Sequence, residues 1–131
     1  MDLDRTPGQI AYAAAEEVRT LNHRTLGLDR IAFENPPEIG ATVEGLLALT
    51  DRLGQSLQQL RAGLQQFDEQ QAIRMDDGSD PASAATKALR DLLNAEQGLG
   101  VMRASLRSAG EAVSHMGGHF APEDEEDSAV V

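Results

Sequence analysis

An apolar stripe with a helical coiled-coil period dominates the middle of this chain. It runs from Ile39 to Phe67 at alternating spacings of four and three residues, and only Thr50 interrupts it. A repeat of about 3.5 residues keeps one seam facing a neighbouring helix along its whole length. The residues of the stripe are Ile39, Val43, Leu46, Leu53, Leu57, Leu60, Leu64 and Phe67. This pattern predicts a long helix that lies along another helix.

The composition favours helices in the rest of the chain as well. Aromatic residues make up 3% of the 131 residues, Ala, Leu and Gln are abundant, and no long alternation of β-branched residues occurs. Strands usually draw on β-branched and aromatic side chains, and helices on unbranched aliphatic ones. A chain of this length can form one domain with a modest core. We therefore predict an all-α fold.

Local signals predict where the helices begin and end. A residue that favours the N-cap position precedes proline at three places: Thr6-Pro7, Asn35-Pro36 and Asp80-Pro81. Gln9 also stands where a capping box with Thr6 requires it. Gly27, the turn-forming segment 75–80 and Gly117 mark the ends. Helices are expected over about 7–27, 36–74 and 81–116.

The third helix carries its own apolar pattern. Its residues are Ala85, Leu89, Leu92, Leu99, Met102, Leu106, Ala109, Val113 and Met116. The short step from Leu99 to Met102 predicts a phase slip near Gly98 and Gly100. A tight turn joins this helix to the second one, so the two must lie antiparallel.

The width of the apolar face predicts the position of the first helix. Around 46–53 the second helix is apolar over a broad arc, whereas from Leu57 to Phe67 only a narrow seam remains. A broad stripe needs two partners. We therefore expect the first helix to lie against the start of the second and the end of the third. The predicted fold is an antiparallel long helical hairpin with a shorter N-terminal third helix, a three-helix bundle over 1–120, and a disordered acidic tail over 121–131.

Charge and composition argue against several classes of partner. The net charge is −11, and phosphate backbones are bound mainly by surplus Lys and Arg, so we expect no nucleic-acid partner. Absence of Cys excludes disulfides and thiolate ligands. The polar first residues and short apolar runs predict neither a cleaved signal nor a membrane association. The expected location is cytoplasmic.

No group of residues predicts a reaction. His115 and His119 have the spacing of a helical metal pair, but Gly117-Gly118 should end the helix between them, and no HExxH glutamate is present. They are the weak candidates for a metal site, and we predict no metal, no cofactor and no enzymatic activity. No serine stands in a nucleophile elbow, and no phosphate-binding loop occurs. His23 stands where an imidazole would cap or pack.

A small basic stripe occurs on the predicted third helix. It consists of Lys87, Arg90, Arg103 and Arg107. Asp91 and Glu96 dilute its charge, and no aromatic residues alternate with it, so we interpret it as a solvated helix face.

Two resemblances add to this interpretation. The order Ala-x-x-x-Val-Arg-x-Leu-Asn-His over 14–23, the Leu/Gln-rich helix and the turn Asp76-Asp77-Gly78-x-Asp80-Pro81 resemble a group of uncharacterised actinobacterial helical-bundle proteins of plasmids and integrative elements. This resemblance implies association with a mobile element. The hairpin also resembles WXG100-type secretion substrates. Those carry Trp-x-Gly in the turn and Tyr-x-x-x-Asp/Glu after the second hairpin helix, whereas here Tyr12 and Glu16 lie in the first helix.

The sequence leads to one main functional hypothesis and two alternatives. The main hypothesis is a noncatalytic protein-interaction or oligomerisation module, accessory to a mobile element, that binds a protein partner or forms a homodimer through the hairpin surface. The first alternative is a WXG100-like hairpin substrate exported without a cleaved signal peptide. The second is an acidic inhibitor or nucleic-acid mimic, suggested by the net charge.

Overall fold

A computed structural model describes residues 1–119 of the chain, so the predicted acidic tail over 121–131 lies outside the described residues. Within 1–119 the chain forms three helices and no strand: α1 (Pro7–Arg24), α2 (Pro36–Glu69) and α3 (Pro81–Val113). The all-α prediction is confirmed.

Each helix begins at its predicted cap. Thr6 Oγ1 accepts a hydrogen bond from the Gln9 N–H at 3.2 Å, and the Gln9 side chain accepts one from the Thr6 N–H at 2.9 Å. The side-chain oxygens of Asn35 and Asp80 accept hydrogen bonds from the backbone N–H three residues on, at 3.1 and 3.2 Å. These bonds satisfy N–H groups that lack partners within the helix, which is why the chain turns helical at these three places.

The long helix α2 ends earlier than the sequence suggested, at Glu69 instead of about residue 74. Gln71 adopts the left-handed conformation with φ 54°. Its N–H donates to the Asp68 carbonyl at 3.0 Å, and the Ala72 N–H donates to the Phe67 carbonyl at 2.9 Å. This pair of bonds is a Schellman motif, which satisfies the last carbonyls and stops the helix without a glycine.

The other two helices also end about three residues before the expected positions. α1 stops at Arg24, where the Thr25 hydroxyl donates to the Leu21 carbonyl at 2.9 Å, and Gly27 follows with φ 74°. α3 stops at Val113, before the Gly117-Gly118 pair is reached. There the Met116 N–H donates to the Val113 carbonyl, three residues back, at 2.9 Å. Both helices therefore end in local hydrogen bonds before the glycine signal.

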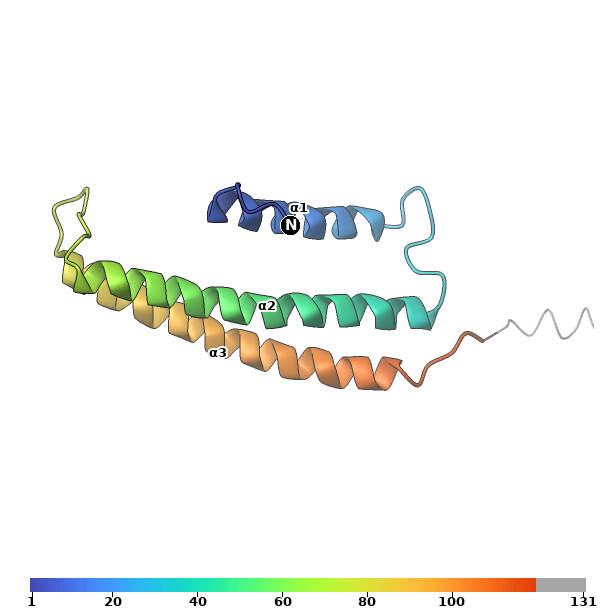
Figure 1. Ribbon diagram of the computed structural model, residues 1–131. Helices are drawn as coiled ribbons and strands as arrows, with labels where there is room; N and C mark the ends of the chain where they lie inside the picture. Colours follow the sequence, from blue (N-terminus) through green and yellow to red (C-terminus); the bar gives the residue numbers. More distant parts are fainter. Residues whose placement is uncertain (120–131) are drawn as a thin grey trace, which may run out of the picture.

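The helices α2 and α3 form an antiparallel hairpin (Figure 1). Across the pair, Gly40 lies opposite Val113 and Gly54 lies opposite Leu99. These contacts define the register along most of the hairpin.

The shorter helix α1 lies beside the first part of α2, and the far end of the hairpin projects beyond it (Figure 1). The position beside the first part of α2 agrees with the prediction, but the predicted packing of α1 against the end of α3 is not seen, and α1 approaches the hairpin loosely. No Cα atom of α1 lies within 8 Å of one in α2 or α3. Only Ala13, Val18 and Leu21 of this helix are half-buried. The close helix packing therefore belongs to the hairpin.

Candidate interaction surface

The seam of α2 contains one predicted column of residues and one unexpected column. The predicted column is Val43, Thr50, Leu57 and Leu64. The second column is Gly40, Leu47, Gly54, Arg61 and Asp68. All nine residues are buried or half-buried. The sequence instead suggested Ile39, Leu46, Leu53, Leu60 and Phe67 as the second column, but four of these are 41–57% exposed and only Leu46 is half-buried. The seam is thus rotated by one residue, and that part of the prediction is wrong.

Glycines explain why α3 packs on this side of α2. A Cβ atom added at Gly40 would lie 3.4 Å from Val113 Cγ1, and one added at Gly54 would lie 3.8 Å from Leu99 Cδ2. From the other helix, a Cβ atom at Gly110 would lie 3.4 Å from Val43 Cγ1. Small residues let two helices approach closely. Side chains of one helix then make dispersion contacts with the backbone of the other, in place of contacts between larger side chains.

The seam of α3 continues without a phase slip. Its half-buried or buried residues are Ala85, Leu89, Leu92, Glu96, Leu99, Arg103, Leu106, Gly110 and Val113, at strict spacings of four and three. Met102, which the sequence suggested for the seam, is 46% exposed. The predicted phase slip is wrong because Glu96 and Arg103 occupy two seam positions, and a search for apolar residues alone does not assign charged residues to the seam.

Both charged residues pair with α2. Arg61 donates through Nε and Nη2 to the Glu96 carboxylate, the second bond at 3.2 Å, and the Glu96 side chain is only 13% exposed. The hydrogen bond between the two side chains raises the pKa of Arg61 above its ordinary value. Arg103 Nε lies 2.8 Å from Asp51 Oδ1 on the more exposed side of the hairpin. Two-point Arg–carboxylate contacts have specific geometry, so the first pair helps to define the helix register.

The basic stripe predicted on α3 is divided by these contacts. Arg103 pairs with Asp51, and Lys87 Nζ lies 2.6 Å from Asp91 Oδ2. Arg90 and Arg107 are exposed.

The residue that interrupts the apolar stripe is the most buried one in α2. Thr50 is 3% exposed, and its hydroxyl donates to the Leu47 carbonyl at 2.7 Å. The hydroxyl is therefore satisfied within its own helix, and the small side chain fits the seam. Ala85 on α3 is equally buried, at 3% exposure.

The displaced apolar column forms a strip on one flank of the hairpin. In an antiparallel coiled coil, the columns that flank the seam on the same side lie next to each other. With the observed register, Met102 and Ala95 are the residues of the flanking α3 column nearest in height to Leu53 and Leu60. We call this surface the apolar strip. It consists of Ile39, Leu46, Leu53, Leu60 and Phe67 of α2 with Ala88, Ala95, Met102 and Ala109 of α3.

The apolar strip is open at the far end of the hairpin. Leu46 is half-buried in the first half of α2, whereas Leu60 and Phe67 in its second half are 57% and 56% exposed. The far end of the hairpin projects past α1 (Figure 1). We call Leu53, Leu60, Phe67, Ala88, Ala95 and Met102 the open end of the strip. Aliphatic and aromatic side chains in a row on a helix pair are typical of a surface that binds another helix.

The histidines suggested as metal candidates both lie outside the helices. His115 and His119 follow the end of α3, and both are exposed. Across residues 1–119, no group of three or more His, Cys, Asp or Glu residues is placed to hold a metal ion.

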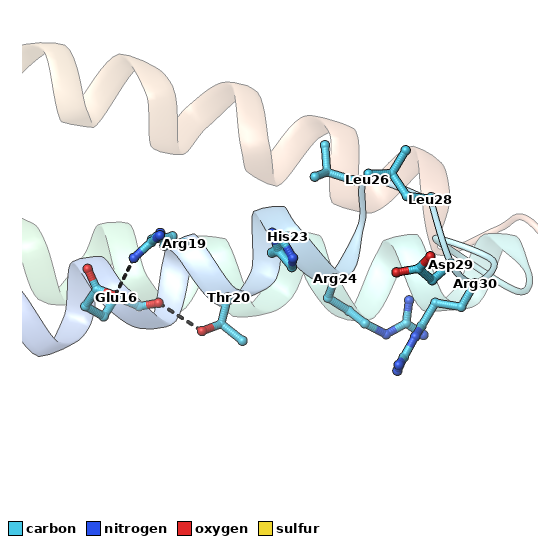
Figure 2. A pocket seen from close by; sticks show the side chains of 10 residues that line it. Glu16, Arg19, Thr20, His23, Arg24, Leu26, Leu28, Asp29 and Arg30 are labelled. Carbon is cyan, nitrogen blue, oxygen red and sulfur yellow. Dashed lines mark hydrogen bonds and ion pairs between the residues drawn. The ribbon is translucent and has the colours of Figure 1, made fainter.

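His23 lines an open hollow of about 460 Å³ between α1 and the connector that follows it (Figure 2). Arg24 Nη1 donates to the Ile31 carbonyl at 2.9 Å, and Arg19 Nη1 donates to Glu16 Oε2 at 3.3 Å. Arg24 therefore fixes the connector to the end of α1, and Arg19 is paired with a carboxylate on its own helix. The hollow lies at the carboxyl end of α1, where the helix dipole disfavours an anion. The sequence reasoning did not single out this feature.

No family model, curated protein or solved structure matches this chain. Over residues 1–119, none of the helices combines the length and hydrophobicity needed to cross a membrane.

Proposed function

We propose that this chain is a noncatalytic protein-interaction module that binds its partner through the open end of the apolar strip. One observation carries this proposal: Leu60 and Phe67 are more than half exposed on a hairpin whose seam is filled by other residues. Exposed aliphatic and aromatic side chains in a continuous row lose unfavourable water contact when another apolar surface covers them.

The hairpin supports this role because it is a preorganised scaffold. The Arg61–Glu96 pair and the glycine contacts hold α2 and α3 in one register. A surface that is ordered before binding loses less conformational entropy when the partner docks. The setting we propose, an accessory role for a mobile element, rests on the resemblance of the sequence alone.

A pair of matched double variants tests the proposed function. Leu60→Lys with Phe67→Lys places two charges in the open end of the strip, and Gln59→Lys with Gln66→Lys places the same charges on the outer face of α2, where both glutamines are exposed. Retrieval of bound proteins from host extract should fall at least about tenfold for the first variant, because burying unpaired charges is costly. Equal retrieval by both variants would contradict the proposal.

An exported hairpin substrate is the second candidate. Tyr12 is 77% exposed on α1, and Glu16 is exposed one turn further on, so both could be recognised by an export apparatus. Secretion by the native host that is lost in Tyr12→Ala would support this candidate, whereas an unchanged distribution would exclude this signal.

A further inference from the structure

The open end of the apolar strip has almost no charge. Its neighbours on α2 are Ser56 and Gly63, and on α3 the adjacent column contains one charged residue, Asp91. The Asp91 carboxylate is already paired with Lys87 Nζ at 2.6 Å. Since the chain has a net charge of −11, two copies repel each other, and they approach most favourably through a face without unpaired charge.

The opposite flank of the hairpin has a different chemistry. At the far end it carries the exposed polar residues Gln58, Gln65 and Thr86 beside Leu93, and nearer the start of α2 it carries the exposed residues Glu44, Asp51 and Arg107. A partner recognised by charge would be drawn to that flank. The partner that fits the open end of the strip therefore presents an uncharged apolar helix face of its own, and a second copy of this chain presents such a face.

The spacing of the open end is symmetric about its middle residue. Leu53, Leu60 and Phe67 are seven residues apart, so a two-fold axis through Leu60 places Leu53 of one copy level with Phe67 of the other. On α3, Ala95 is the strip residue nearest in height to Leu60 within each copy. A small side chain beside Leu60 leaves room for the Leu60 side chain of a second copy.

From these observations we propose that the open end of the apolar strip binds the same surface of a second copy, forming an antiparallel, two-fold symmetric dimer with Leu60 at its axis. The inference rests on the proposed function, because it names the partner of that surface. The far halves of the two hairpins form a short four-helix bundle.

The area of the overlap determines how stable this dimer is. At about 1.5 Å per residue, the part of α2 from Leu53 to Glu69 is roughly 25 Å long, and two helices are about 20 Å wide. Each copy then buries roughly 500 Å², and the total of about 1,000 Å² is at the lower limit of specific interfaces. The dimer is thus expected to dissociate on dilution.

The experiment uses the absence of native cysteine. Leu60→Cys and, as the matched control, Gln59→Cys are made in the full chain and oxidised at a protein concentration at which light scattering of the unmodified chain shows the dimer. A two-fold axis at Leu60 brings the two introduced thiols together, so Leu60→Cys should form a disulfide-linked dimer at least about tenfold faster than Gln59→Cys. Equal rates for both variants would overturn the proposal.

Light scattering of the unmodified chain provides the independent measurement. The mass should rise from monomer to dimer with concentration, and the Leu60→Lys and Phe67→Lys double variant should remain a monomer with unchanged helix content. A monomer at every concentration would overturn the dimer. If the monomer still retrieves a host protein in a strip-dependent way, the proposed function stands and only the identity of the partner is wrong. If neither binding depends on the strip, both proposals fail.

Discussion

Arg61 of α2 and Glu96 of α3 meet inside the hairpin seam, where Arg61 Nη2 lies 3.2 Å from Glu96 Oε1. Both occupy positions at which the coiled-coil pattern would otherwise have an apolar residue. An ion pair in such a position makes register specific, although it does not by itself make the fold more stable.

The first prediction concerns this pair. Glu96→Ala should lower the urea midpoint, because it leaves the Arg61 guanidinium half-buried without its carboxylate. Replacing both partners by Leu should restore or exceed the original midpoint, since apolar residues of similar volume fill the seam. Circular dichroism at increasing urea concentration measures the unfolding midpoints of the unmodified chain, the Glu96→Ala variant and the double Leu variant. A double variant that is less stable than Glu96→Ala would contradict the interpretation.

A second prediction concerns the tightly packed small residues. Ala85 is 3% exposed, so Ala85→Leu should destabilise the hairpin by about 1–3 kcal/mol through overpacking. Ala104 is exposed on the same helix, and Ala104→Leu should change the free energy of unfolding by less than about 0.5 kcal/mol. Equal effects of the two substitutions in urea titrations would show that Ala85 is not in a packed seam.

The third prediction is that substitutions at two helical glycines change the free energy of unfolding in opposite directions. Nothing lies within 4 Å of a Cβ atom added at Gly45, so Gly45→Ala should stabilise the chain by about 1 kcal/mol through helix propensity. Gly110 contacts Val43, and Gly110→Leu should destabilise the hairpin by about 1–3 kcal/mol because a larger side chain forces the helices apart. Thermal and urea unfolding of the two variants should therefore shift in opposite directions.

The cap of α3 predicts a pH dependence. Hydrogen bonds from the Ser83 hydroxyl and N–H lower the pKa of Asp80 below its ordinary value of 3.8. The ionised cap therefore contributes stability above that value, and the contribution is lost as the pH falls through the lowered pKa of the folded state. Asp80→Asn keeps a side-chain cap without this titration, so its urea midpoint should fall less steeply in acid. Parallel acid profiles of the two proteins would contradict this assignment.

The loose position of α1 leads to the last prediction. Because no Cα atom of α1 comes within 8 Å of the hairpin helices, α1 should open without unfolding α2 and α3. Hydrogen exchange followed by mass spectrometry should show protection in the middle of α2 at least about tenfold higher than in α1. Equal protection would indicate that the three helices unfold as one unit.

Much of the fold could be read from local chemistry. The residue pairs Thr6-Pro7, Asn35-Pro36 and Asp80-Pro81 predicted where the helices begin, because a side-chain cap needs only the next three residues. The helix ends were less predictable. At Gln71 the left-handed conformation occurs in a residue other than glycine, and no simple sequence signal marks it.

The candidate surface could be predicted only in part. The sequence suggested a docking face on the hairpin and identified Leu60 and Phe67 as apolar stripe residues, but it placed them inside the seam. A signal for the true seam was present, since Glu96 and Arg103 continue the four-three spacing of α3. Apolar pattern matching favours Met102 over Arg103, because it does not anticipate that Asp51 lies opposite.

The amino-acid sequence by itself determined that the chain is helical, where each helix starts and that α2 and α3 run antiparallel, because these properties depend on neighbouring residues and a short turn. Only the tertiary structure decided which two columns of α2 face α3. A helix with more than two candidate columns can bury any adjacent pair of them. The choice depends on how closely the partner approaches over Gly40 and Gly54 and on which charges meet, which are properties of both helices together.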